Sequence, residues 1–325
     1  MALLAVGLSL AWIIALSHIV VPFALGAETS GPGARSVGDE NPRRNANPAA
    51  ERDETGEEPE FPGKRQIHAL AEAYPARIEE IEVREDQWAA RIGDTWYYYA
   101  QGRMLPRELI DQYAGYTTIR LYEYRTGPPR LPEVDEERAE RLRNRSRLRA
   151  TDPPVRHNGF LDALYGVHSA AEAERRMVRI RFLGLSTRVH PKLVEPLERV
   201  EAEVRELMRQ NSEVRRFVDS LGTASGYVWR EIAGTASRSY HSYGIAIDLI
   251  PRSYEGRFGY WQWAEQAGVE NWWELPFERR WHVPQPMVDA FERQEFIWGG
   301  KWLSFDPIHF EYRPELFILG GHRDS

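Results

Sequence analysis

The chain has 325 residues, a formal net charge of −7 and no cysteine. Its length is enough for one large domain or two modest ones, and a hydrophobic fraction of 42% with 11 tryptophans is typical of a packed globular protein. The lack of cysteine excludes disulfides and thiolate metal sites, so any metal must be held by His, Asp or Glu. The negative charge argues against a nucleic-acid partner, because phosphate binding requires a basic face.

Residues 1–27 form an apolar segment that contains no Lys, Arg, Asp or Glu. One interpretation is a secretory signal peptide that ends near residues 24–27, where small side chains suit signal peptidase. The other is an uncleaved membrane anchor, because the apolar run is about long enough to span a bilayer. Either interpretation predicts an exported protein of the periplasm or cell envelope, and the second also predicts attachment to the inner membrane.

Residues 28–65 are rich in Gly, Pro, Asn, Glu and Arg, which predicts a disordered linker. Regular structure is expected from about Gln66, and no catalytic constellation is found before residue 150. We interpret residues 66–150 as a small α+β accessory region, with a wall-binding module as the alternative. The patterns predict a helix over 67–74, a strand over 78–83, a hairpin over 88–99, a helical turn over 108–113, a strand over 117–124 and a charged helical segment over 133–149.

A second region is expected over residues 151–325. The clearest helix is predicted over 191–217, where apolar residues recur at three- and four-residue steps with charges between them. A tryptophan-rich stretch over 260–281 is interpreted as a packed lid or cleft wall, with a sugar-stacking platform as the alternative. Further patterns predict helices over 159–164, 170–177 and 287–294 and a strand over 178–183.

The most informative run is residues 239–248, which reads Ser-Tyr-His-Ser-Tyr-Gly-Ile-Ala-Ile-Asp. Its second half alternates like a strand, with apolar residues at 245, 247 and 249 on one face and small residues leading to Asp248 on the other. His241 precedes this strand beside Gly244, where the chain can turn its imidazole back towards Asp248. The spacing therefore predicts a strand that lines a cleft with a carboxylate and an imidazole.

A second run, residues 308–312, alternates in the same way and places His309 and Glu311 on one face. Asp306 has the opposite parity to His309, so both can face one site only where Pro307 bends the chain. The two runs together supply two histidines and two carboxylates. A mononuclear zinc hydrolase needs this inventory, because three side chains hold the metal and a nearby carboxylate moves protons.

These runs resemble the zinc D-Ala-D-Ala carboxypeptidase family, the group of the vancomycin-resistance D,D-peptidases and the phage L-alanyl-D-glutamate endolysins. The family reads Ser-x-His-x-x-Gly-x-Ala-x-Asp, followed by an acid shortly ahead of a His-aromatic pair, and the resemblance covers roughly residues 226–312. It implies that His241, Asp248 and His309 are ligands of Zn²⁺ and that Asp306 is the general base.

The resemblance also implies a fold and further roles. The fold class is α+β, with a small antiparallel sheet that carries the His-Asp-His zinc site and is packed by helices. Arg230 lies where relatives carry an arginine, so it is the candidate anchor for a substrate carboxylate, which a guanidinium binds with two parallel hydrogen bonds. Ser239 is expected to orient a ligand or the substrate, and Glu311 to act as a partner of a ligand rather than as the base. The other histidines, among them His190, are interpreted as structural.

The predicted function is an exported zinc-dependent peptidase that acts on peptidoglycan stem peptides, like a D-alanyl-D-alanine carboxypeptidase. Metal-bound water would attack the peptide bond and Asp306 would accept its proton. An aspartate base looks more like the endolysin branch, so an L-Ala-D-Glu endopeptidase is one alternative. A zinc-containing wall-binding or signalling protein without catalysis is the other alternative.

Overall fold

The computed structural model describes residues 61–153 and 155–321, all of which belong to one compact unit. The predicted signal peptide or anchor (1–27) and almost all of the predicted linker (28–65) lie outside the described residues. Across the described ranges, no helix combines the length and the apolar character that a bilayer crossing requires.

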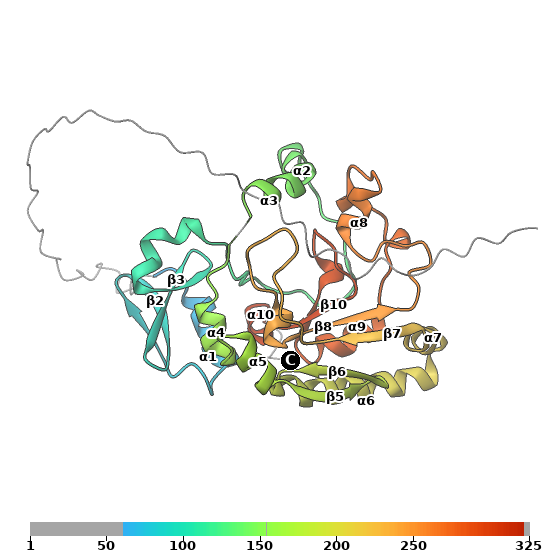
Figure 1. Cartoon of the computed structure of the whole chain (residues 1–325), viewed down its shortest axis with the longest axis horizontal. Helices are drawn as coiled ribbons and strands as arrows, with labels where there is room; N and C mark the ends of the chain where they lie inside the picture. The colour runs from blue at the N-terminus through green and yellow to red at the C-terminus, as the bar shows by residue number, and fades with distance from the viewer. Residues whose placement is uncertain (1–60, 154, 322–325) are drawn as a thin grey trace, which may run out of the picture. The chain divides into compact units, whose positions relative to one another are not determined.

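The described chain begins with an α+β region (Figure 1). Its strands form an antiparallel meander in the order β1-β2-β3-β4, and the predicted hairpin is confirmed with a two-residue turn at Gly93-Asp94. Gly93 has φ 58, a left-handed conformation that glycine adopts without strain. The elements are α1 (Lys64–Ala73), β1 (Glu80–Arg84), β2 (Gln87–Ile92), β3 (Thr95–Ala100), β4 (Arg103–Pro106) and the 3₁₀ helix η1 (Arg107–Gly115).

The predicted strand over 117–124 is wrong. The amides of Thr117, Ile119 and Tyr124 donate to carbonyls in three separate parts of the chain, so no continuous ladder forms. Arg120 adds a second interruption, because its φ of 55 leaves the extended region altogether. The alternating pattern of this segment reflects individual contacts rather than a place in a sheet.

The charged segment over 133–149 is helical as predicted, and it consists of two short helices. The following predicted elements are also confirmed. The bounds are α2 (Glu136–Arg143), α3 (Arg145–Thr151), α4 (Gly159–Tyr165), α5 (Ala170–Arg176) and β5 (Val178–Phe182). The strand β6 (Leu185–Val189), which was not predicted, pairs with β5 as a hairpin.

The single helix predicted over 191–217 is wrong, because the chain breaks at Asn211. A 3₁₀ turn, η2 (Pro191–Leu193), leads into α6 (Val194–Gln210), and α7 (Ser212–Ser220) follows. Asn211 has φ −123 and ψ 110, and its Oδ1 accepts the amides of Glu213 and Val214 at 2.9 and 3.2 Å. Asn211 therefore begins a new helix as its N-cap, which a hydrophobic period alone does not reveal.

The central sheet has the order β7-β8-β10-β9 and is antiparallel throughout. Its helical cover includes α9, where Phe291 stacks on Phe310 of β10 with ring centroids 3.9 Å apart. The last helix, α10, lies against α1 of the N-terminal region. The elements are β7 (Leu221–Ser225), η3 (Tyr240–Tyr243), β8 (Ala246–Pro251), α9 (Gln285–Glu292), β9 (Phe296–Trp298), η6 (Gly299–Lys301), β10 (His309–Tyr312) and α10 (Pro314–Leu319).

The tryptophan-rich stretch forms a packed wall, as predicted. It contains α8 (Trp261–Gln266) and the 3₁₀ turns η4 (Trp272–Glu274) and η5 (Phe277–Arg279). Trp263 is 40% exposed, whereas the other four tryptophans of the stretch are buried at 5% exposure or less. Buried rings pack rather than offer a platform for sugars.

The α+β fold class is therefore confirmed, with small antiparallel sheets and helices packed against them. The division into an accessory region (66–150) and a peptidase domain (151–325) stays a prediction.

Candidate metal centre

Two of the expected ligands meet because of the register of the central sheet. Asp248 of β8 and His309 of β10 are direct cross-strand partners. Side chains opposite each other on one face of an antiparallel pair lie within contact distance. Accordingly, His309 Nδ1 lies 2.7 Å from Asp248 Oδ1, and both residues are more than 90% buried.

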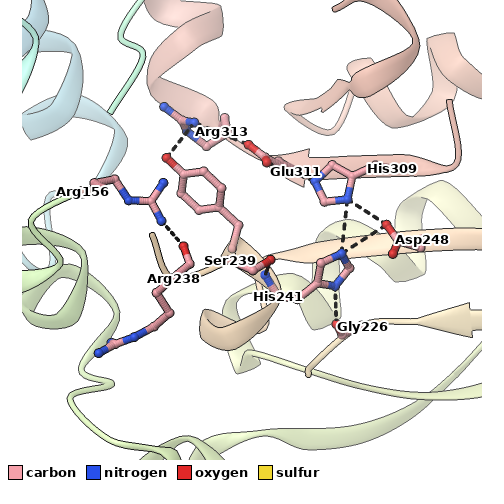
Figure 2. A network of polar contacts seen from close by, with 10 residues as sticks. Arg156, Gly226, Arg238, Ser239, His241, Asp248, His309, Glu311 and Arg313 are labelled. Carbon is pink, nitrogen blue, oxygen red and sulfur yellow. Dashed lines mark hydrogen bonds and ion pairs between the residues drawn. The ribbon is translucent and has the colours of Figure 1, made fainter. Parts of the chain in front are cut away.

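The third ligand arrives from the turn ahead of β8. Ser239 Oγ accepts the amide of His241 at 3.3 Å and so caps η3. Gly244 ends the turn in a left-handed conformation with φ 65, where a Cβ would lie 2.3 Å from the sulfur of Met177. The turn sends the imidazole of His241 back to Asp248, and its Nε2 lies 3.1 Å from Asp248 Oδ1 (Figure 2).

The partners of each imidazole define its tautomer. His241 Nδ1 lies 2.5 Å from the carbonyl of Gly226, an oxygen that can only accept, so Nδ1 carries the proton. His309 Nε2 donates to Glu311 Oε1 at 3.0 Å. The free lone pairs are then His241 Nε2 and His309 Nδ1, which face each other at 3.2 Å. Glu311 thus holds the ring of His309, the candidate ligand beside which the resemblance placed it.

This donor set fits a divalent metal ion. One atom from each of His241, Asp248 and His309 lies within 4.8 Å of the others. The two facing nitrogens and the carboxylate oxygen lie 2.7, 3.1 and 3.2 Å apart. Tetrahedral zinc with bonds of 2.0–2.2 Å requires ligand separations of about 3.3 Å. The centre can therefore bind a metal through these three atoms.

The electrostatics of the centre favour a positive charge. Burial acts to raise the pKa of Asp248, but the charges and hydrogen bonds of His241 and His309 hold it below its usual value. Burial acts to lower the pKa of His309, yet the neighbouring carboxylates of Asp248 and Glu311 raise it well above its usual value. Both shifts have the same origin, because two carboxylates surround the imidazoles.

Asp306 lies beside the centre in the turn that precedes β10. Its carbonyl accepts the amide of His309 at 3.1 Å, and Pro307 occupies the bend as expected. The side chain is half-buried, and its Oδ1 atom is buried without a hydrogen-bond partner in the described part of the chain. Burial raises the pKa of Asp306 to about 7, with the charges of His309 and Arg230 acting in the opposite direction. This carboxyl group can gain or lose a proton near neutral pH.

Arg230 and Ser239 occupy different positions relative to the centre. Ser242 Oγ contacts both the backbone amide and the backbone carbonyl of Arg230, each at 2.9 Å. The guanidinium of Arg230 is exposed, and it has no carboxylate partner among residues 61–153 and 155–321. The charge of Arg230 reaches Asp306, whose pKa it lowers. Ser239 is 4% exposed and contacts the backbone of His241. The roles of both residues towards substrate stay predictions.

Several residues near the centre were not predicted. Burial, together with the charges of Asp306 and Asp248, raises the pKa of Tyr254 to about 12, and its ring packs edge-on against Trp263 and Trp281. Arg313 forms an ion pair with Glu311. Nothing in the spacing of the chain indicates either residue. Arg238 pairs with Asp162, and its side chain is 17% exposed.

The two motifs and their geometry define a metallopeptidase-type centre, and comparison with known families agrees. Residues 233–312 match a family model described as D-alanyl-D-alanine carboxypeptidase, which confirms the resemblance predicted from the motifs. All four of His241, Asp248, Asp306 and His309 lie in this match, whereas Arg230 precedes it. Residues 66–120 match a model described as a domain of unknown function (DUF8518). Searches of curated proteins and of solved structures found no significant match.

Proposed function

We propose that the protein is an exported zinc peptidase that hydrolyses peptidoglycan stem peptides, as a D-alanyl-D-alanine carboxypeptidase. The observation that carries the proposal is the convergence of His241, Asp248 and His309 in one buried cluster within the family match. Nitrogen and oxygen donors of this kind suit zinc best among the common divalent ions, because a His-Asp-His set leaves one tetrahedral position open.

Bound zinc would act as a Lewis acid and make water nucleophilic near neutral pH. Asp306 takes the proton in this scheme and returns it to the leaving amine, which is the work of a general base. Its Oδ1 has no hydrogen-bond partner among the described residues and is therefore available to accept that proton. His241 and His309 keep their ligating nitrogens free because Gly226 and Glu311 hold the opposite nitrogens.

Arg230 binds the substrate carboxylate in this proposal, because its guanidinium is exposed, unpaired and close enough to act on Asp306. Ser239 contributes by fixing the turn that carries His241.

A second group of guanidiniums supports an acidic substrate. Arg145 and Arg149, one helical turn apart on α3, both lie over the ring of Trp261, at 5.5 and 5.7 Å from its centroid. Neither forms an ion pair with any described carboxylate, and Arg145 Nε is buried without a hydrogen-bond partner. The amide of Trp261 donates to the carbonyl of Phe305, the neighbour of Asp306. Stem peptides carry several carboxylates, which these two side chains could bind.

Export and a location in the periplasm or cell envelope rest on the apolar segment 1–27, which also underlies membrane attachment. These parts of the proposal come from the sequence alone.

An L-Ala-D-Glu endopeptidase is the second candidate, and the specific observation that favours it is an aspartate at position 306. An aspartate is shorter than a glutamate by one methylene, as in the endolysin-type branch that the motif resembles. A zinc-containing wall-binding protein without catalysis is the third candidate, and the free carboxyl group of Asp306 argues against it.

Mass spectrometry of purified muropeptides, incubated with the zinc-loaded protein and with Asp306→Asn, tests the proposal. We expect the wild type to release a terminal D-Ala and Asp306→Asn to be slower by about 10²- to 10⁴-fold. Cleavage between L-Ala and D-Glu moves the activity to the second candidate. No cleavage by a zinc-loaded wild type that still binds sacculi contradicts catalysis and supports the third candidate.

A further inference from the structure

One buried guanidinium, that of Arg313, connects parts of the chain that are far apart in sequence. Arg313 follows β10 directly and is 4% exposed. Its Nε donates to Glu315 at 2.5 Å, and its Nη1 donates to Tyr240 Oη at 3.2 Å and faces Glu311 Oε2 at 3.5 Å. Every nitrogen of this planar group has a partner, an arrangement that a lysine side chain does not reproduce.

The remaining partners of this guanidinium come from the N-terminal region. Arg313 Nη2 donates to the carbonyls of Ile119 and Arg120 at 3.0 and 3.3 Å. Arg120 adopts a left-handed φ of 55, an uncommon conformation for a residue other than glycine. The segment that the sequence pattern predicted as a strand thus bends here, and it presents two successive carbonyls to one buried cation.

Tyr74, at the end of α1, makes the second connection. Its hydroxyl donates to Glu315 Oε2 at 2.9 Å, and Glu315 Oε1 accepts from Arg313. Tyr74 is 1% exposed and Glu315 is 2% exposed, so this contact is shielded from water. Tyr74, Ile119 and Arg120 all lie within residues 66–120, the match to a domain of unknown function.

On the other side, the same guanidinium contacts residues next to both histidines of the cluster. Glu311 accepts from His309 Nε2 through one oxygen and faces Arg313 through the other. Tyr240, whose hydroxyl also accepts a hydrogen bond from Arg313, directly precedes His241 in the sequence. The direction of the Glu311 carboxylate decides which nitrogen of His309 is free for a metal.

We propose that residues 66–120 are a structural part of the metal centre and that Arg313 is the positioning residue through which they act. The N-terminal region fixes Arg313, Arg313 fixes Glu311, and Glu311 fixes His309. The inference rests on the proposed function only for the presence of the metal. It gives the region of unknown function a role that does not require wall binding.

Charge burial argues that this network does more than fill space. Glu311, Glu315 and Arg313 are all at least 94% buried. Burying such groups costs several kcal/mol each, and apolar residues of similar size often replace them without loss of stability. This network of buried charges instead ends at His309, a proposed metal ligand, so we interpret it as orienting that imidazole.

The test compares the zinc affinities of the wild type, Arg313→Lys and Tyr74→Phe, measured on the full chain by competition with a chelator and without substrate. Arg313→Lys is expected to weaken zinc binding by about 10-fold or more, because it loosens Glu311, the direct partner of His309. Tyr74→Phe, which removes one hydroxyl two contacts further away, is expected to weaken it by about 2- to 30-fold.

Tyr97→Phe is the matched control. Tyr97 is a buried tyrosine of the same region, and its hydroxyl donates to the carbonyl of Gly159 at 3.0 Å, outside the network. The Tyr97→Phe variant should lose a comparable hydrogen bond and keep the zinc affinity of the wild type. If Arg313→Lys does not fold, the comparison of Tyr74→Phe with Tyr97→Phe tests the inference, because only Tyr74→Phe should weaken zinc binding.

Wild-type zinc affinity in both Tyr74→Phe and Arg313→Lys overturns the inference, as does an equal loss in Tyr97→Phe. A wild type that binds no zinc overturns it too, because the centre itself is then absent. A protein that binds zinc but cleaves no stem peptide contradicts the proposed function alone, since the affinity measurement contains no substrate.

Discussion

The two four-stranded sheets use charge in opposite ways. The N-terminal sheet, β1-β2-β3-β4, carries its ion pairs on the surface, as where Arg91 contacts Glu79 and Glu80 with side chains 30–50% exposed. The central sheet, β7-β8-β10-β9, buries its charges, with Asp248 at 8% and Glu311 at 6% exposure.

The contrast separates charges that maintain solubility from charges that build a site. Exposed ion pairs contribute roughly 0–1 kcal/mol, because water screens them and side-chain ordering opposes them. Buried charges cost several kcal/mol each unless they are paired and hydrogen-bonded. The central sheet therefore keeps buried charges where metal binding would need them, whereas the N-terminal sheet keeps its ion pairs where water screens them.

The largest expected effect comes from a ligand. His241→Ala should lose stoichiometric zinc and lower kcat/KM on stem peptides by roughly 10³-fold or more, since a metal supplies several kcal/mol of transition-state stabilisation. His168→Ala, a change at an exposed histidine, is the control and should keep both zinc and activity. Full zinc content in His241→Ala would remove this residue from the ligand set.

A buried histidine outside the centre should make stability depend on pH. His190 Nε2 lies 3.1 Å from the carbonyl of Tyr165 and its Nδ1 accepts the amide of Lys192, so the neutral ring is held. Burial lowers the pKa of His190 to about 4, from 6.5 in the unfolded chain. The unfolded state then binds the proton more tightly, so this stabilisation is complete above pH 6.5 and is lost as pH falls towards 4.

The size of that loss is about 3 kcal/mol, from 1.36 kcal/mol per pKa unit. Urea unfolding of the wild type and of His190→Asn at pH 7 and pH 4.5 measures it as a difference. The wild type should lose more stability between the two pH values than the variant. Identical losses would contradict a neutral, buried His190.

A smaller effect is expected at the proposed substrate anchor. Arg230→Lys should raise KM about tenfold for peptides with a free terminal carboxylate, because a lysine lacks the two parallel donors of a guanidinium. Arg257→Lys is the control, since Arg257 is an exposed arginine that lies 4.0 Å from Glu255. Steady-state kinetics on free and amidated peptides should reveal the loss only with the free carboxylate. An equal loss on both peptides would exclude carboxylate binding by Arg230.

The smallest effect is expected on the surface of the N-terminal sheet. Arg91→Gln removes the contacts to Glu79 and Glu80, yet it should change the free energy of unfolding by less than about 1 kcal/mol. Thermal unfolding at low and high salt checks this, with any difference shrinking at high salt. A loss of several kcal/mol would show that the two sheets do not differ in the way described.

The two motifs of the candidate metal centre could be predicted from the sequence because the geometry within each motif is local. Strand alternation predicted that Asp248 lies on the cleft-lining face of one strand and that His309 and Glu311 share one face of a second strand. In the structure, the register of the sheet brings these two faces together. The turn at Gly244 and the bend at Pro307 were equally local, because each depends on one residue's backbone preference.

The remaining features depend on contacts between distant segments. Arg313 meets the carbonyl of Ile119 across 194 positions, and Glu315 meets Tyr74 across 241. No periodicity records such pairs. The prediction of one continuous helix across Asn211 failed for another reason. The apolar stripe continues across this residue, but the Asn side chain caps the start of a new helix.

The most direct test of the central claim is a crystal structure of the zinc-loaded protein with anomalous diffraction data at the zinc edge. The account predicts one strong peak at about 2.0–2.2 Å from His241 Nε2, Asp248 Oδ1 and His309 Nδ1. A peak bound to other residues, or an empty cluster in a crystal that contains zinc, would contradict it.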